Sequence, residues 1–139
     1  MNMKQDIAQL LLRFALASGF LSAVASRLNL WGKQSSGWQN FLSYTAQVNS
    51  FINKSFIPTI AISTTVLEIL LGILLLGGYQ TNYVAFASAI LTLLFACAMT
   101  ISFGVKETLD YSVFVFSASA FLLASFGSYK WSIDQLLNL

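Results

Sequence analysis

The sequence predicts an all-α fold: a membrane four-helix bundle with an additional interfacial amphipathic helix between spans one and two. Of its 139 residues, 57% are hydrophobic and only 9% are charged, whereas a soluble domain usually carries about 25% charged residues. Four apolar runs approach or exceed the roughly 20 residues that a helix needs to cross a bilayer. They cover residues 7–28, 57–77, 83–103 and 110–127. We therefore expect residues 1–139 to form a single integral membrane domain in contact with the lipid bilayer.

The composition also excludes several classes of protein. The seven basic residues are scattered and the net charge is only +2, so no nucleic-acid-binding surface is expected. The chain lacks histidine, and its one cysteine, Cys97, cannot form an internal disulfide. We expect no metal site, no covalently bound cofactor, and a small buried side chain at Cys97. Redox chemistry would require a bound cofactor or a partner protein.

The first span, residues 7–28, follows a short polar segment and carries Arg13 about one and a half turns in. Its length and its internal arginine are unlike a cleavable signal peptide, so we expect it to be retained. Small residues recur along it at helical spacing, which favours close approach of another helix. These residues are Ala15, Gly19 and Ala23, with Ser18, Ser22 and Ser26 beside them.

The connection between the first two spans, residues 29–56, is the only long one. Gly32, Gly37 and the serines between them predict irregular chain at its start. From Trp38 to Ile52, apolar residues recur at helical spacing with polar residues between them, which predicts a short amphipathic helix. Such a helix would either anchor the chain at the membrane interface or form a lid over a cavity in the bundle.

The second span has a carboxylate, Glu68, near its middle. At membrane depth a carboxylate needs an ionic partner, a proton or a wet cavity. Ala61, Thr65, Glu68 and Gly72 share one helical face, whereas leucines cover much of the remaining surface. The small and polar face is therefore expected to point into the bundle.

Short connections join the remaining spans. Gly77 and Gly78 end the second span, so the third span, residues 83–103, is predicted to be its antiparallel neighbour. Asp110 lies at the expected start of the fourth span, where a carboxylate can cap free amides; a catalytic duty is the alternative. Four spans place both termini on one side of the membrane. Basic residues are more numerous on the side of the long loop, which favours a cytoplasmic loop.

We predict that Arg13 and Glu68 form an ion pair inside the bundle. In antiparallel helices with a rise of 1.5 Å per residue, Arg13 lies about 9 Å and Glu68 about 13 Å from the matching ends of their spans. An arginine side chain can bridge that difference. In the alternative, Arg13 extends to the headgroups, and Glu68 is protonated and bonded to Thr64 or Thr65 of its own helix. The candidate ligand-binding or structural polar core thus comprises Arg13, Glu68, Thr65, Thr64 and Asp110, and no catalytic residue is predicted.

Four stretches of the sequence resemble the DoxX family of small bacterial membrane proteins with four spans. They are LLRFALASGFLSAVASRLNLWG near the start, LEILLGILLLGGYQT in the second span, DYSVFVFSASAFLLAS in the fourth and YKWSID near the end. The family pattern has an arginine early in the first span and a glutamate before a glycine-containing leucine run in the second. Arg13 and Glu68 match these two positions.

The resemblance implies a multi-pass bundle in the bacterial inner (cytoplasmic) membrane. Some relatives are named as subunits associated with quinol oxidation or thiosulfate:quinone oxidoreduction, and distant eukaryotic relatives act in cargo export, sterol handling or receptor assembly. The resemblance favours an accessory subunit of a quinone-linked redox system rather than an autonomous enzyme. Quinone would be its ligand and other membrane subunits its partners. Two alternatives stay open. One is a non-enzymatic module that binds a lipid-like ligand or assists membrane-protein assembly; the other is a small transporter or proton path.

Overall fold

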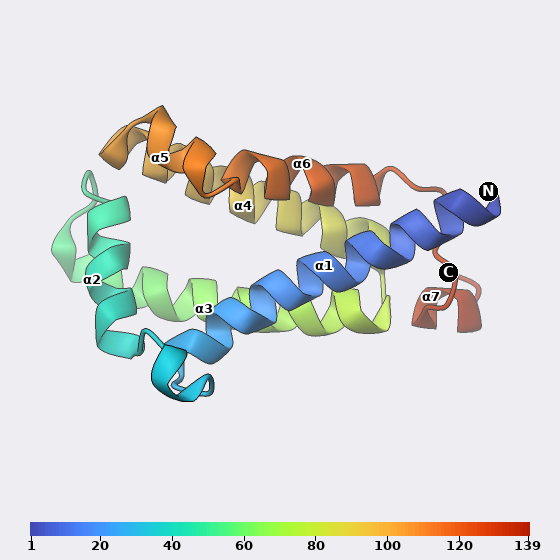
Figure 1. Ribbon diagram of the computed structural model, residues 1–139, viewed down its shortest axis with the longest axis horizontal. Coiled ribbons are helices and arrows are strands. Elements are labelled where there is room, and N and C mark those ends of the chain that lie inside the picture. Colours follow the sequence, from blue (N-terminus) through green and yellow to red (C-terminus); the bar gives the residue numbers. More distant parts are fainter.

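The computed structural model describes all 139 residues, and its regular elements are helices only. The predicted all-α fold is therefore confirmed. Four apolar helices form the body of the molecule, and a short helix crosses one end of it (Figure 1). The α-helices are α1 (Met3–Arg27), α2 (Trp38–Val48), α3 (Ile57–Gly77), α4 (Thr81–Phe103), α5 (Val105–Asp110), α6 (Val113–Ala124) and α7 (Ile133–Leu136). Two 3-10 turns, Gly32–Gln34 and Lys54–Phe56, lie on either side of α2.

Local sequence explains where the long helices begin and end. A reciprocal capping box between Asn2 and Gln5 opens α1, and Pro58 occupies the first turn of α3, where its missing N–H is harmless. Gly78 ends α3 with φ = 71°. A Cβ at Gly78 would collide with the Ser132 side chain and lie 2.9 Å from Arg13 Cζ, so only glycine fits this tightly packed turn.

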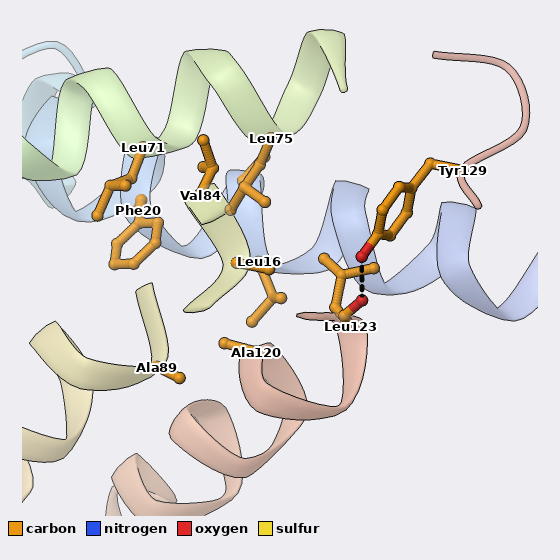
Figure 2. Close-up of a cluster of buried hydrophobic side chains, with 11 residues drawn as sticks. Leu16, Phe20, Leu71, Leu75, Val84, Ala89, Ala120, Leu123 and Tyr129 are labelled. Atoms are coloured by element: carbon orange, nitrogen blue, oxygen red, sulfur yellow. Dashed lines mark hydrogen bonds between the residues drawn. The ribbon is translucent and has the colours of Figure 1, made fainter. Parts of the chain in front are cut away.

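The four apolar helices pack as two pairs, α1 with α3 and α4 with α6. The pairs converge near the chain termini and diverge toward α2 (Figure 1). The main hydrophobic core lies in the converging half, where Tyr129 folds back and donates a 2.8 Å hydrogen bond to the Leu123 carbonyl (Figure 2). Its labelled members are Leu16, Phe20, Leu71, Leu75, Val84, Ala89, Ala120, Leu123 and Tyr129. The diverging half has no comparable apolar filling, which leaves room between the pairs.

The outer faces of these helices are apolar, as contact with lipid requires. Large side chains exposed on the surface include Leu11, Phe14, Ile62, Val66, Leu70, Ile73, Phe86, Ile90, Leu94, Val115 and Phe121. A soluble monomer rarely exposes so continuous an apolar surface. Three helical segments are long and apolar enough to cross a membrane: Met3–Arg27, Lys54–Gly77 and Thr81–Phe103. The chain is therefore an integral membrane protein.

The prediction for the fourth span was wrong in its extent. The continuous helix expected over 110–127 is limited to α6, whose 12 residues extend only about 18 Å, less than the roughly 30 Å apolar thickness of a bilayer. The chain leaves helical geometry at Tyr111, and Ser112 adopts a left-handed conformation with φ = 57°. Non-helical backbone at membrane depth is tolerated where it lines a cavity, and Tyr111 does line one.

The predicted capping role of Asp110 was also wrong. Asp110 is the last residue of α5 and lies 2.6 Å from Lys106 Nζ in an exposed i,i+4 ion pair. Ser112 separates it from α6 and provides no side-chain cap. Because the turn at Tyr111 and Ser112 separates Asp110 from α6, the carboxylate does not cap that helix.

Two packing expectations require correction. Cys97 is exposed on α4 rather than buried. The small residues of α1 do not form a continuous helix–helix seam, since Ala15, Ser18 and Ser22 are exposed. Gly19 is the exception: a Cβ there would lie 2.8 Å from Phe116 Cε2, so glycine allows α6 to approach α1 at this point.

The amphipathic segment between the first two spans forms a helix, as predicted. This helix, α2, spans the open end of the bundle and contacts both α3 and α4. Val48 at its C-terminal end is fully buried against Ala98 and Met99, and Ser102 of α4 donates a hydrogen bond to the Val48 carbonyl. α2 is thus a bridge between the two helix pairs where they diverge.

Membrane topology provides the first test. Both termini lie at the converging end and the loop containing α2 lies at the opposite end (Figure 1). Reporter fusions at residues 1 and 139 should therefore report the same compartment, and a reporter inserted at Asn53 should report the other. Different compartments for the two termini would contradict this arrangement.

Candidate functional site: a polar cavity beneath α2

A cavity of about 690 Å³ lies beneath α2, between the diverging helix pairs. Its volume falls within the approximately 300–1,000 Å³ typical of small-molecule sites. Its lining comes from the end of α1, from α2, from the first half of α3 and from Thr92 and Phe95 of α4. Tyr111, in the break before α6, completes the wall. The cavity is therefore assembled from parts of the chain that are distant in sequence.

An ion pair between Arg27 and Glu68 lies in the cavity wall. Arg27 Nη1 contacts Glu68 Oε2 and also donates a 3.1 Å hydrogen bond to Thr65 Oγ1. Thr65 in turn donates to the Ala61 carbonyl at 2.8 Å. The two charged side chains are 13% and 14% exposed, so they are mostly withdrawn from solvent and lipid but still reach the cavity.

The pair leaves polar atoms free for a ligand. Arg27 makes all its side-chain hydrogen bonds through Nη1, and Glu68 makes its bond through Oε2. Arg27 Nε and Nη2 and Glu68 Oε1 have no hydrogen-bond partner within the protein. None of these three atoms is fully buried, so a ligand can reach them. The site therefore offers both hydrogen-bond donors and a charged acceptor at one position.

Aromatic residues frame the polar pair. The Arg27 guanidinium lies 3.8 Å above the centre of the Phe41 ring, which holds it from the α2 side. Tyr44 packs against Phe95 and Phe103 of α4, at 6.5 Å and 6.2 Å between ring centres, and its side chain lines the cavity. Burial, reinforced by nearby Tyr111 and Glu107, raises the pKa of Tyr44, so its hydroxyl remains a hydrogen-bond donor at neutral pH.

A smaller arm of about 330 Å³ continues the cavity toward the middle of the bundle. It shares Arg27, Glu68 and Tyr44 with the polar chamber. The residues that line the arm but not the polar chamber carry no polar side chain: Gly19, Phe20, Met99, Val113 and Phe116. The combined space therefore has a polar end under α2 and an apolar end between α1, α4 and α6.

The predicted Arg13–Glu68 ion pair was wrong. Arg13 is only 1% exposed, and its guanidinium donates four hydrogen bonds to main-chain carbonyls. Nε and Nη2 reach Leu75 and Leu76 at 3.0 and 3.3 Å, in the last turn of α3. Nη1 and Nη2 reach Lys130 and Trp131 at 3.1 Å each. The negative end of the α3 dipole and carbonyls outside regular helix thus satisfy this arginine without a carboxylate contact.

Side-chain direction explains why the pairing differs from the prediction. Side chains lean toward the N-terminus of their own helix. In an antiparallel pair, Arg13 therefore leans toward the C-terminal end of α3, away from Glu68, which lies about 10 Å earlier along that helix. Arg27 and Glu68 lean toward each other by the same rule. An estimate based on α-carbon depth alone misses this difference.

Polar contacts also bind the C-terminal segment to the converging end. Asp134 accepts hydrogen bonds from the amides of Gln80 (2.6 Å) and Thr81 (2.8 Å), and so caps α4. Asp6 lies 3.3 Å from Lys130 Nζ, and Gln9 donates to the Lys130 carbonyl at 3.1 Å. With Arg13, these residues form a structural clamp that joins α1, α3, α4 and the segment after α6.

The structure divides the predicted polar core. Glu68, Thr65 and Thr64 lie at the cavity, whereas Arg13 belongs to the clamp and Asp110 is on the exposed surface of α5. Sequence reasoning missed Arg27 and Tyr44 as members of this site. The usable signal for Arg27 was its position in the last turn of the first span, from which it leans back toward Glu68.

The fold and the cavity define a multi-pass helical membrane protein with an amphipathic internal site. A family model described as DoxX matches residues 8–101. The chain therefore belongs to the DoxX family. The matched region contains Arg13, Arg27, Glu68 and most of the cavity lining. No curated protein and no solved structure matches the chain significantly.

Replacement of Arg13 should destabilise the fold. Arg13→Gln removes a charged donor from four carbonyls, and each hydrogen bond to a charged group contributes roughly 1.5–3 kcal/mol. We expect a marked fall in thermal stability in detergent, whereas Lys106→Gln, at an exposed ion pair, should leave stability almost unchanged. Equal melting temperatures for both variants would contradict the clamp.

A double-mutant cycle should separate the two arginines. Arg27→Gln combined with Glu68→Gln should show a non-additive stability change of about 0.5–3 kcal/mol, as expected for residues in contact. Arg13→Gln combined with Glu68→Gln should be additive within about 0.5 kcal/mol. The measurement is thermal or denaturant unfolding of the purified protein, and coupling of Glu68 to Arg13 instead would overturn the observed pairing.

Proposed function

We propose that the protein is an accessory subunit of a quinone-linked redox system in the bacterial inner membrane, and that it binds the quinone in the cavity beneath α2. The observation that carries the proposal is the Arg27–Glu68 pair in the wall of a cavity that has one polar and one apolar end. A quinone has the same division, with two oxygens on a flat ring and an apolar chain.

The polar chamber fits the head of such a ligand. A quinone oxygen is a hydrogen-bond acceptor, and Arg27 Nε and Nη2 and the Tyr44 hydroxyl are donors without a protein partner. Phe95 and Tyr44 offer aromatic faces to a planar ring. The free Glu68 Oε1 can accept a hydrogen bond from the hydroxyl of a reduced quinol.

The side-chain composition of the chain supports an accessory role. With no histidine and a single cysteine, the sequence lacks the usual ligands of haem and iron–sulfur clusters. Electrons would therefore enter or leave the quinone through a partner subunit, and this chain would hold and orient the ring. Membrane subunits that carry a redox group are thus the proposed partners.

The same cavity supports a second proposal, a non-enzymatic module for another lipid-like ligand. A lipid with a polar head and one chain would use the same donors and the same apolar arm. The two proposals differ in which molecule co-purifies, so one experiment distinguishes them.

The test is mass spectrometry of molecules extracted from protein purified in native-membrane discs. We expect quinone enrichment over the surrounding membrane, and a loss of about tenfold or more in Arg27→Gln, since hydrogen bonds to charged groups are worth roughly 1.5–3 kcal/mol. Lys106→Gln removes the same charge from an exposed ion pair outside the cavity and should retain the quinone.

The outcomes separate the proposals. Enrichment of a different lipid that is also lost in Arg27→Gln would favour the binding module over the redox subunit. Equal quinone content in wild type, Arg27→Gln and Lys106→Gln would contradict binding in this cavity. Melting temperature and helix content of each variant establish that the comparison is made between folded proteins.

A further inference from the structure

The apolar arm of the cavity reaches the outer surface between α1 and α6. Its outer wall is the contact of Gly19 with Phe116, and Gly19 is exposed while Phe116 is half-buried. On the inner side, Phe116 packs edge-on against Phe20 with 5.1 Å between ring centres. The Phe116 side chain thus lies where the arm meets the lipid-facing surface.

The wall at this point is weak because it joins the two helix pairs. α1 packs chiefly on α3, and α6 chiefly on α4, while direct contact between α1 and α6 is much more limited. The pairs are held together firmly at the converging end, by the core and the Arg13 clamp. At the depth of Gly19 the contact depends on the Phe116 ring, which can change rotamer without movement of a helix.

The arm is also continuous with the polar chamber. Seven lining residues belong to both spaces: Ala23, Arg27, Tyr44, Glu68, Thr92, Phe95 and Tyr111. From Arg27 to Gly19 the distance along α1 is eight residues, or about 12 Å. A ligand whose polar head lies at Arg27 would therefore have its apolar part level with Phe20 and Phe116.

We propose that this arm binds a single flexible apolar chain of the ligand, between α1 and α6, and that the chain enters from the bilayer at the Gly19–Phe116 contact. The proposal rests on the proposed function, because it assigns the head of the same ligand to Arg27 and Glu68. It adds the orientation of the ligand and a lateral route from the lipid. The ligand is accordingly a membrane-dissolved amphiphile that need not pass beneath α2.

The route has a physical advantage for such a ligand. A chain that moves from lipid into an apolar arm keeps an apolar environment throughout, whereas passage beneath α2 would bring it past polar residues such as Asn40, Ser43 and Gln47. Gly19 makes the lateral opening possible, since a side chain there would occupy the space of the Phe116 ring.

Photo-crosslinking of the full chain in lipid nanodiscs tests the proposal. The probes are two decyl-chain benzoquinones, one with a diazirine at the chain end and one with a diazirine next to the ring, each with and without excess decylubiquinone. The chain-end probe should label peptides that contain Gly19–Phe20 and Val113–Phe116. The ring probe should label peptides that contain Arg27, Tyr44 or Glu68. Competition by decylubiquinone should remove both sets of labels.

Phe116→Trp provides a variant test, with Phe121→Trp as the matched control on the lipid-facing side of α6, where Phe121 contacts only Phe86 among the aromatic rings. Overpacking of the arm should reduce chain-end labelling at Gly19–Phe20 by at least about fivefold. Phe121→Trp should label as wild type. Labelling in wild type decides the question even where Phe116→Trp fails to fold.

The labelling pattern distinguishes failure of the chain site from failure of quinone binding in the cavity. Competable ring labelling near Arg27 together with chain-end labelling on α2, or on exposed α4 residues such as Leu94, would overturn the chain site and leave quinone binding intact. Absence of any competable labelling would overturn both. Equal loss of labelling in Phe116→Trp and Phe121→Trp would overturn the role of Phe116.

Discussion

The insertion of the Arg13 guanidinium among four main-chain carbonyls is the interaction on which the rest of the structure depends. A permanently charged side chain inside a membrane bundle must find acceptors, because it cannot practically lose its proton. The last turn of a helix supplies such carbonyls without a second buried charge. By binding the last turn of α3 and the segment after α6 together, Arg13 fixes the register of α1 against α3. Gly78 is required at the same point, since any side chain would occupy the space of the guanidinium.

Concentration of the contacts at one end leaves the other end open. The core and the clamp hold the helix pairs together near the termini, and the pairs separate toward α2 (Figure 1). In water such a gap would collapse or fill with apolar side chains. In lipid the hydrophobic driving force for helix association is weak. The gap persists because α2 bridges it through Val48 and Ser102 and because the Arg27–Glu68 pair needs polar surroundings. A membrane bundle can therefore keep a cavity that a soluble bundle of this size would lose.

The sequence predicted the first three long helices and α2, but not the side-chain partners within the bundle. Apolar length and the glycine pair at 77–78 predicted α3 to the residue, and helical spacing predicted α2. The fourth span was overestimated because apolar content does not reveal the left-handed turn at Ser112. Glu68 was identified as a residue in need of a partner, but the choice between Arg13 and Arg27 depends on which way each side chain leans. Asp134 was missed because a cap that joins residues 54 apart has no local pattern.

The two arginines of α1 show how the same residue type serves two purposes. Arg13 is enclosed, with every hydrogen bond made to the backbone, and such a group holds a structure in one arrangement. Arg27 is paired to a carboxylate and a hydroxyl at a cavity, with two of its three nitrogens unbonded. An ion pair with unused donors is a poor means of stabilisation, because desolvation of both charges offsets most of the attraction between them. Its position in the wall of an amphipathic cavity agrees with the proposal of a ligand that completes the hydrogen bonding. On this proposal, the stabilising arginine lies near the middle of α1 and the binding arginine at its C-terminal end, about 21 Å apart.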